Sequence, residues 1–353
     1  MQSSLLRPIG AAAAFAVLVT ACGGTSRHSS PSALVAIGAG LRGPSGLHAT
    51  VYARGITHVS AFAFDSRGRL WATASGASGH AGDGVFLVAR SGAHPVKVVA
   101  GPKGPLGLVW IGESLYVSSL GAVTRFSGLD GTHFGSRQTV LHGPVPGGEN
   151  NNLVRAPDGQ LLMGISSTCD HCVPPSRYAA TIVSFRPDGS GLTTFARGVR
   201  AAYGLVFYPG TRNLLATMNQ RDDLGAKTPG DWLALVRRGE DWGFPACYGQ
   251  GGAVCRGVPQ PIAVLDKHAA AGGVTVLTTQ LDSRFAGSAL VAEWQTGKVQ
   301  LIPLERTSSG YRGTAQPFLT GIADPLPVTV TADGAVLVGD WSTGTVYRIS
   351  ASK

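Results

Sequence analysis

Short apolar segments separated by turn residues run through most of the chain. Segments such as "FAFDSRGRLWATAS" and "VTVTADGAVLVGDW" alternate apolar and other residues on both sides of a turn rich in Gly, Asp and Ser. Alternation with a period of about two residues is typical of half-buried β-strands. No long segment has the periodicity of an amphipathic helix. The pattern therefore predicts an all-β protein.

The unit of a turn followed by a short apolar strand recurs six times along the chain. Its turns lie at intervals of about 46 to 52 residues, with one longer interval of about 73, at Asp65 to Gly68, Gly112, Asp158-Gly159, Gly210, Ser283-Arg284 and Asp333-Gly334. Repeats of about 40 to 50 residues that each hold several strands are typical of propeller blades. We therefore expect a six-bladed β-propeller over residues 48–353, with an insertion between blades near residues 240–262. A two-sheet sandwich array, the alternative, would not explain a single shared period.

The two ends of the repeat region are also strand-like. The segment "LHATVYARG" precedes the first unit and "GTVYRIS" follows the last. Pairing of these segments in one blade would close the ring and remove an exposed sheet edge.

Polar residues precede the expected inner strand of the third unit, in "GGENNNLVRAPDG". The innermost strands of a propeller surround a central channel, so the residues that lead into them converge on one pocket. Glu149, Asn150 and Asn151 are therefore candidates for the mouth of this channel. The alternative is that the asparagines only bond their own backbone, as they do in turns.

The amino-terminal residues have the pattern of a secretory signal. Arg7 is followed by the apolar run "IGAAAAFAVLVTA" and then by Cys22, which predicts a signal peptide over residues 1–21. A cysteine at the cleavage point resembles a bacterial lipobox, so Cys22 is expected to carry a lipid, with a flexible tether over residues 22–47. The protein would then be a lipoprotein anchored outside the cytoplasmic membrane. A secreted protein without an anchor is the alternative.

Four further cysteines form two close pairs, Cys169 with Cys172 and Cys247 with Cys255. Outside the cytoplasm, two short-loop disulfides are the natural assignment. A zinc site or a redox motif at "CDHC" is the alternative, but zinc would need a second pair of ligands at suitable spacing. The net charge of +9 comes from scattered Lys and Arg with no basic run, so we expect no nucleic-acid partner.

Several segments together resemble a known family. "ARGVRAAYGLVFYPGTRNLLATMNQRDDLG", "WGFPACYG" and "PLPVTVTADGAVLVGDWSTGTVYRIS" are similar to the glucose/sorbosone dehydrogenase family, and in particular to its sorbosone-dehydrogenase-like branch. The resemblance implies a six-bladed propeller that uses pyrroloquinoline quinone (PQQ) and calcium. It implies oxidation of a sugar or a sugar aldehyde, with electrons passed to an external acceptor.

The resemblance also implies roles for individual residues. Arg200 matches the arginine of a family motif and, with Lys267, Asn151 and Trp294, is a candidate for binding the cofactor, because guanidinium groups pair strongly with carboxylates. Asp222 and Asp231 could offer oxygens to calcium, a cation that prefers oxygen ligands. His268 precedes the expected inner strand of the fifth unit and is a candidate catalytic residue.

Two family features are missing from the chain. The histidine that serves as general base should fall at or beside Gly148 or Glu149, and Leu326-Pro327 stands where an arginine often precedes a proline. Glu149 could act as the base instead, because a carboxylate in a dry pocket can take up a proton near neutral pH. Otherwise the propeller would bind a carbohydrate or a protein partner without oxidising it. A calcium-dependent lactonase is a third possibility.

Overall fold

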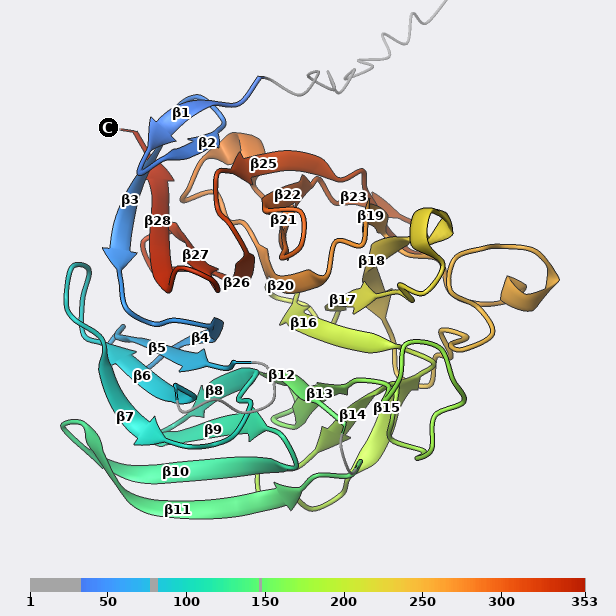
Figure 1. Ribbon diagram of the computed structural model, residues 1–353, viewed down its shortest axis with the longest axis horizontal. Coiled ribbons are helices and arrows are strands. Elements are labelled where there is room, and N and C mark those ends of the chain that lie inside the picture. Colours follow the sequence, from blue (N-terminus) through green and yellow to red (C-terminus); the bar gives the residue numbers. More distant parts are fainter. Residues whose placement is uncertain (1–32, 77–81, 146–147, 353) are drawn as a thin grey trace, which may run out of the picture. The chain divides into compact units, whose positions relative to one another are not determined.

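Six antiparallel β-sheets lie around a common centre in the computed structural model of the chain (Figure 1), which describes residues 33–76, 82–145 and 148–352. The predicted six-bladed propeller is therefore confirmed. The predicted signal peptide and the lipid attachment at Cys22 lie outside the described residues and stay predictions. No helix within the described ranges is long and apolar enough to span a membrane.

Each blade is named here by its strands, from the innermost strand outwards. Blade 1 holds β4 (Val59–Phe64), β5 (Leu70–Ala74), β6 (Gly84–Val88) and β7 (Val96–Ala100); blade 2 holds β8 (Gly107–Ile111), β9 (Ser114–Ser119), β10 (Ala122–Asp130) and β11 (His133–His142); blade 3 holds β12 (Asn150–Arg155), β13 (Leu161–Ile165), β14 (Thr181–Phe185) and β15 (Thr193–Arg197).

The remaining blades complete the ring. Blade 4 holds β16 (Ala201–Phe207), β17 (Leu214–Asn219), β18 (Gly230–Val236) and β19 (Ala263–Lys267); blade 5 holds β20 (Ala271–Val276), β21 (Ala289–Glu293), β22 (Lys298–Ile302) and β25 (Gln316–Thr320); blade 6 holds β26 (Pro325–Val330), β27 (Val336–Asp340), β28 (Thr345–Ala351) and β3 (Leu47–Ala53).

The two ends of the propeller meet in blade 6, as the sequence predicts. Strand β3 pairs antiparallel with β28, with Leu47 opposite Ala351 and Ala53 opposite Val346. The inner strands contact one another in the order β4, β8, β12, β16, β20, β26 and back to β4. The ring is thus closed by strand pairing between segments at opposite ends of the described chain.

The predicted tether is too long at its carboxyl end. Strands β1 (Val35–Gly38) and β2 (Leu41–Gly43) pair with each other, and β2 extends blade 5 by pairing with β25. Ile37 and Leu41 are buried against Phe318 and Leu319. Because these apolar side chains find a core, residues from Val35 onwards belong to the folded unit.

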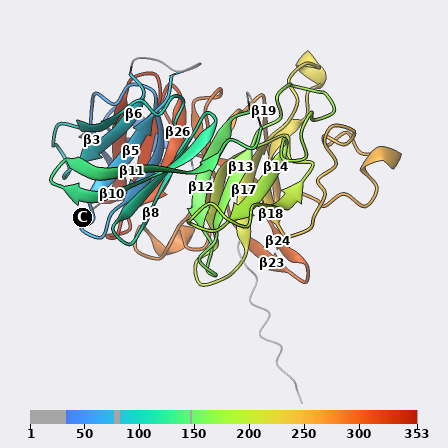
Figure 2. The same cartoon turned by 90° about the horizontal axis from the view of Figure 1, so that it is seen from below.

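The predicted insertion near residues 240–262 exists but lies inside a blade, not between two blades. It connects β18 to β19, the third and fourth strands of blade 4, and contains the short helix η2 (Ala253–Cys255). In the side view this loop, drawn in orange, projects beyond the strands (Figure 2). A separate hairpin of β23 (Glu305–Thr307) and β24 (Gly310–Arg312) connects β22 to β25.

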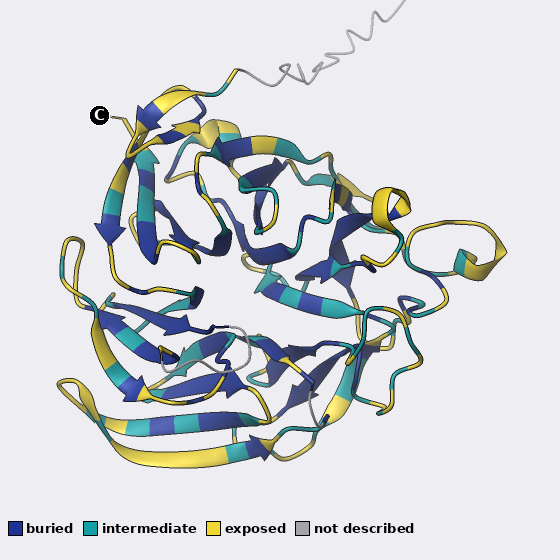
Figure 3. Cartoon of the chain, viewed as in Figure 1, coloured by how far each residue is buried: buried dark blue, intermediate teal, exposed yellow. Residues whose placement is uncertain are grey.

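The hydrophobic core consists of separate clusters between neighbouring blades. Six such clusters occur among the described residues, one for each pair of adjacent blades. Buried residues accordingly concentrate in the inner and middle strands, and exposed residues in the outer strands and loops (Figure 3). Since both faces of a blade pack on a neighbour, middle strands such as β5, β13, β14, β21 and β27 are buried at every residue.

The inner strands share an irregularity near their first residues. The register against the second strand shifts in five of these six described pairs, for example between Asn150 and Leu153 and between Ala202 and Leu205. A bulge re-aims the side chains around it. The repeated shift therefore turns the residues that lead into each blade towards the centre.

The close packing of inner strands gives a first prediction, at Gly204 in β16. A Cβ atom at this position would lie 2.5 Å from Gly272 O and 2.9 Å from Val274 N of the next blade. Gly204→Ala should therefore lower the free energy of unfolding by about 1–3 kcal/mol, as overpacking does, in chemical denaturation. Gly82→Ala is the control, because a Cβ atom there meets nothing within 4 Å; equal stability of both variants would contradict this packing.

Candidate functional site

A cavity of about 780 Å³ lies over blades 3 to 5, where the inner strands begin and the second strands end. Its wall is formed by Glu149, Ser166, Ser167, Thr168, Cys169, Arg200, Ala201, Asn219, Asp222, Asp231, His268, Ala270, Trp294 and Gln295. Tyr203 of blade 4 reaches across the central channel, and its hydroxyl donates to Ser60 O of blade 1 at 2.8 Å.

Most of the residues that the sequence singles out meet at this cavity. Six of them line it: Glu149, Arg200, Asp222, Asp231, His268 and Trp294. They come from three blades and are far apart in the chain. Glu149, Arg200 and His268 precede inner strands, so for these three the lead-ins converge on one pocket as predicted. Asp222 and Asp231 come instead from the connection between β17 and β18 and from β18 itself, and Trp294 follows β21.

Asn150 and Asn151 do not line the cavity, contrary to the prediction. Both side chains are buried. The Asn150 amide donates to Ser119 O of blade 2 at 2.8 Å, and the Asn151 amide donates to Ser166 Oγ at 2.9 Å. Because their donors are used within the protein, the asparagines stabilise the start of β12, and Asn151 is not available to a cofactor.

Lys267 also lies away from the cavity wall. Its Nζ donates to Ala226 O at 3.1 Å, and its side chain is exposed. Lys267 ends β19, the outermost strand of blade 4. The residue is adjacent to His268 in sequence, but it points to the loop of η1 (Gly225–Lys227) and not into the pocket.

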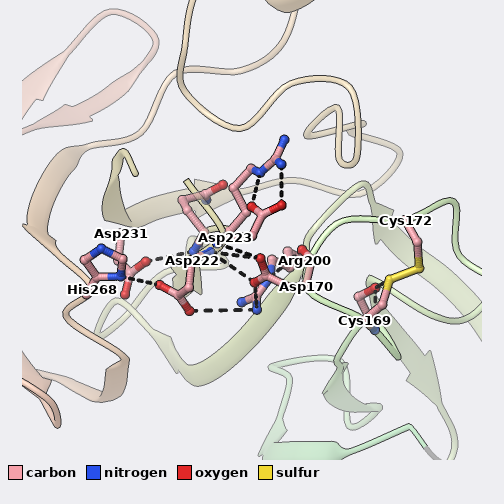
Figure 4. A network of polar contacts seen from close by, with 11 residues as sticks. Cys169, Asp170, Cys172, Arg200, Asp222, Asp223, Asp231 and His268 are labelled. Carbon is pink, nitrogen blue, oxygen red and sulfur yellow. Dashed lines mark hydrogen bonds and ion pairs between the residues drawn. A yellow bond between two sulfur atoms is a disulfide. The ribbon is translucent and has the colours of Figure 1, made fainter. Parts of the chain in front are cut away.

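Asp170 connects Arg200 with the loop of Asp222 and Asp223 (Figure 4), and no motif in the sequence indicates this role. Its carboxylate accepts hydrogen bonds from Arg200 at 2.5 Å, from the backbone N–H of Asp222 at 3.0 Å and from that of Asp223 at 2.9 Å. The Asp170 carbonyl also accepts from Arg200 Nε at 2.9 Å. One short loop thus fixes both the arginine of the pocket and the segment that carries Asp222.

The two predicted disulfides are confirmed, and they hold the loops that border the site. Cys169 is bonded to Cys172, and Cys247 to Cys255. The loops touch each other through His171, whose ring packs edge-on against Phe244 and Tyr248. Asp170 lies inside the first disulfide ring, so the cross-link restricts the residue that holds Arg200.

His268 is held from both sides of its ring. Its Nδ1 lies 2.8 Å from Asp222 Oδ1, and its Nε2 lies 3.0 Å from Gly225 O. A carboxylate and a carbonyl are both acceptors, so the two contacts favour the protonated imidazole, in which both ring nitrogens donate. The bond to Asp222, followed by that to Gly225, raises the pKa of His268 above its ordinary value. In the protonated form the ring has no lone pair with which to act as a general base.

We predict that His268 titrates above the range of an unpaired histidine and that Asp222→Asn lowers its pKa. Because the pKa is raised in the folded protein, the stabilisation is complete below the unfolded value of about 6.5 and is lost as the pH rises through the folded pKa. A titration of the ring by NMR would measure this. A pKa that does not change in Asp222→Asn would show that the carboxylate is not the partner.

Asp231 is a buried structural carboxylate. Its two oxygens accept from the backbone N–H groups of Gln220 at 2.7 Å and of Ala271 at 3.1 Å. Asp83 makes the same connection in blade 1, to Gly76 N at 2.8 Å and Gly104 N at 2.7 Å. Asp231 thus joins blade 4 to blade 5, as Asp83 joins blade 1 to blade 2.

Burial raises the pKa of Asp231 from 3.8 to about 6. The protonated form is therefore favoured by folding: the contribution is complete below about pH 4 and is lost as the pH rises through about 6. We expect the free energy of unfolding of the protein, relative to Asp231→Asn, to fall by about 3 kcal/mol between pH 4 and pH 7. Denaturant titrations at several pH values would test this; a difference that does not vary with pH would contradict it.

The predicted calcium ligands Asp222 and Asp231 and the predicted base Glu149 also lack the surroundings that these roles require. The Asp222 carboxylate pairs with His268 and lies 4.0 Å from Arg200, and both Asp231 oxygens are occupied. Within the described ranges no three His, Cys, Asp or Glu side chains are grouped so as to hold a metal ion. Glu149 lines the cavity but is exposed, so it does not have the dry surroundings that its proposed role as base assumes.

Trp294 and Trp341 follow β21 and β27, the second strands of blades 5 and 6. Their rings meet edge to face, with centroids 5.6 Å apart. Trp341 donates its Nε1–H to Ser75 O of blade 1 at 3.0 Å and packs against His58. Only Trp294 of the two lines the cavity.

Solved structures with the same architecture are sugar dehydrogenases. An AA12-family carbohydrate-active enzyme of Trichoderma reesei is 17% identical with a TM-score of 0.73, covering 88% of this chain and 97% of that one. The PQQ domain of a pyranose dehydrogenase of Coprinopsis cinerea is 16% identical with a TM-score of 0.72, covering 88% and 97%. The PQQ-bound aldose sugar dehydrogenase of Streptomyces coelicolor is 18% identical with a TM-score of 0.68, covering 88% and 100%.

The chain shares the six-bladed propeller fold of PQQ-dependent sugar dehydrogenases. No family model matches its sequence and no curated protein matches it either. The likeness therefore concerns the fold, and the chemistry has to be argued from the cavity.

Proposed function

We propose that the cavity binds a carbohydrate of the aldose type. The observation that carries this proposal is the composition of the cavity wall. Hydroxyl groups of Ser166, Ser167 and Thr168, two amides and three carboxylates surround a space of about 780 Å³ that also exposes one indole ring, that of Trp294. Sugars present many hydroxyl groups and an apolar ring face, which such a lining matches. The sugar dehydrogenases with the same fold support the choice of ligand class.

PQQ is the cofactor named for two of these structures, and its three carboxylates require cationic partners. In the described part of the chain, the cavity wall has two basic side chains, Arg200 and His268, and both already pair with carboxylates. Three acidic side chains line the same wall. The cavity wall therefore does not supply the cations that the three carboxylates of PQQ would need, and we derive no reaction step through this cofactor.

The residues of the site act as a rigid frame for a ligand. Asp170 orients Arg200, and Asp222 orients His268. Both ion pairs hold their side chains at fixed positions on the cavity wall. A ligand therefore does not have to order these side chains, which lowers the entropic cost of binding. In this arrangement neither His268 nor the exposed Glu149 is prepared to remove a proton from a sugar hydroxyl.

Oxidation of the bound sugar by a quinoprotein mechanism, with an external electron acceptor, is the second candidate. It is favoured by Arg200, which lines the cavity, and by a fold that matches the sugar dehydrogenases over nearly their full length. This candidate requires PQQ or calcium to displace the acidic partners of Arg200 and His268. The calcium-dependent lactonase has no comparable support, because Asp222 and Asp231 are engaged within the protein and Asn151 does not line the cavity.

A titration of the full chain with aldoses, and separately with PQQ and calcium, would test the proposal through tryptophan fluorescence and calorimetry. We expect saturable binding of an aldose without PQQ and unchanged by a chelator, and no binding of PQQ at micromolar concentration. Trp294→Ala should weaken aldose binding about tenfold or more by removing the stacking surface. Trp242→Phe is the control, since Trp242 is buried away from the cavity.

Two outcomes would contradict the proposal. Failure of every aldose to bind at millimolar concentration would show that the cavity does not recognise sugars. Chelator-sensitive binding of PQQ together with sugar-dependent reduction of a dye would establish the second candidate, and would show that the ion pairs at Arg200 and His268 rearrange.

A further inference from the structure

One acidic side chain on the cavity wall has no partner within the protein. Glu149 lines the cavity and is exposed, and its carboxylate makes no hydrogen bond or ion pair with the residues that the structure describes. We infer that this carboxylate selects the ligand by charge: it binds the ammonium group of an amino sugar and disfavours sugars that carry an acid. This inference rests on the proposed binding of a carbohydrate and names the class of sugar that binds best.

The other charged groups of the wall are paired or buried. Arg200 is bound to Asp170, with 2.5 Å between Nη2 and Oδ1, and Figure 4 shows this contact. His268 is bound to Asp222, with 2.8 Å between Nδ1 and Oδ1. Both oxygens of Asp231 accept backbone N–H groups, and burial raises the pKa of Asp231 to about 6. An anionic ligand would have to displace an acid from a cation, whereas a cationic ligand meets one carboxylate that is not engaged.

The carboxylate of Glu149 lies near the centre of the propeller, on backbone that is held in place. The Glu149 carbonyl accepts from Ser166 N–H at 3.1 Å, and the next residue, Asn150, donates its amide to Ser119 O at 2.8 Å. Burial raises the pKa of the Tyr203 phenol, and the negative charge of Glu149 raises it further. Since Tyr203 reaches across the central channel, the carboxylate lies near the mouth of that channel and not at the rim of the propeller.

The cavity is negative although the chain as a whole is positive. The net charge of the chain is +9. With Asp231 protonated, three ionised carboxylates remain around two cations, and the excess charge is that of Glu149. A concave site with walls of low dielectric constant focuses such a field. The cavity should therefore attract a cationic sugar and repel sugar acids.

The composition of the wall indicates what kind of cation binds. In the part of the chain that the structure describes, no three His, Cys, Asp or Glu side chains are placed to hold a metal ion, so a divalent cation would lack ligands. An ammonium group on a sugar offers several donors to the carboxylate and to nearby acceptors. The hydroxyl groups of the same sugar remain for Ser166 and Ser167, and its ring face for Trp294. An amino sugar thus uses the free charge and the neutral groups of the wall together.

The test compares sugars that differ in charge, by calorimetry with the full chain at about pH 6, where a carboxylate in water is ionised and an amino group is protonated. The probes are D-glucose, D-glucuronate and the 2-amino, 3-amino and 6-amino deoxy analogues of glucose. We expect one amino sugar to bind the wild type about fivefold or more tightly than glucose, and glucuronate to bind more weakly than glucose.

Two substitutions assign the preference to one carboxylate. Glu149→Gln removes the charge and keeps the size of the side chain, so it should bring the affinities of the charged sugars close to that of glucose. Glu113→Gln is the matched control, because it changes the net charge equally at an exposed residue that does not line the cavity. It should keep the wild-type order. Added salt should weaken the binding of the amino sugar but not of glucose, because an exposed ion pair is screened.

The outcomes separate this inference from the proposed function. If the wild type binds none of the five sugars, both are wrong. If it binds glucose but no amino sugar more tightly, charge selection is wrong while sugar binding stands. A preference that persists in Glu149→Gln, or that is lost equally in Glu113→Gln, would overturn the role of Glu149. Loss of glucose binding together with a Tm well below that of Glu113→Gln would show that Glu149 is structural.

Discussion

Buried carboxylates that accept backbone N–H groups hold the blade junctions at the end of the propeller where the cavity lies. Asp83 and Asp231 each connect the end of a second strand to the start of the next blade. Asp340, the last residue of β27, accepts from the backbone N–H groups of Ala323 and Asp324, which lead into β26. Glu293, the last residue of β21, accepts from the backbone N–H of Asp266 in β19 of the neighbouring blade. Irregular lead-ins cannot satisfy their own N–H groups by strand pairing, so the acids supply the missing acceptors before β8, β20 and β26.

This use of carboxylates determines what the cavity can do. When only the sequence is known, an acidic residue expected at the mouth of the central channel suggests a metal ligand or a general base. In the structure Asp231 joins two blades, Asp222 holds His268, and Asp170 holds Arg200. Each of these three carboxylates has a partner within the protein, so these groups and the cations they bind are not available to a charged cofactor. A neutral ligand with many hydroxyl groups meets these residues without breaking their bonds.

The sequence predicted the features that repeat or that obey simple rules. The period of the turns gave the blade number, the strand-like ends gave the closure of the ring, and the spacing of four cysteines gave both disulfides. It also placed Arg200 and His268 at one pocket. It could not predict Asp170, whose role depends on how a disulfide loop folds over the next blade. It could not separate Asn151 from Glu149 either, because the burial of Asn151 depends on its bond to Ser166, a residue that follows another strand.

The fold and the residues of the cavity support different readings of this chain, and the differences can be located. The resemblance in sequence was strongest in blades 4 and 6, where glycines, aromatic residues and turns maintain the packing. The residues that would act on a substrate differ: Gly148 and Leu326 stand where a base and an arginine were expected, and the two remaining cations are neutralised by Asp170 and Asp222. The packing of a scaffold survives many substitutions, whereas the binding of a charged cofactor depends on a few side chains.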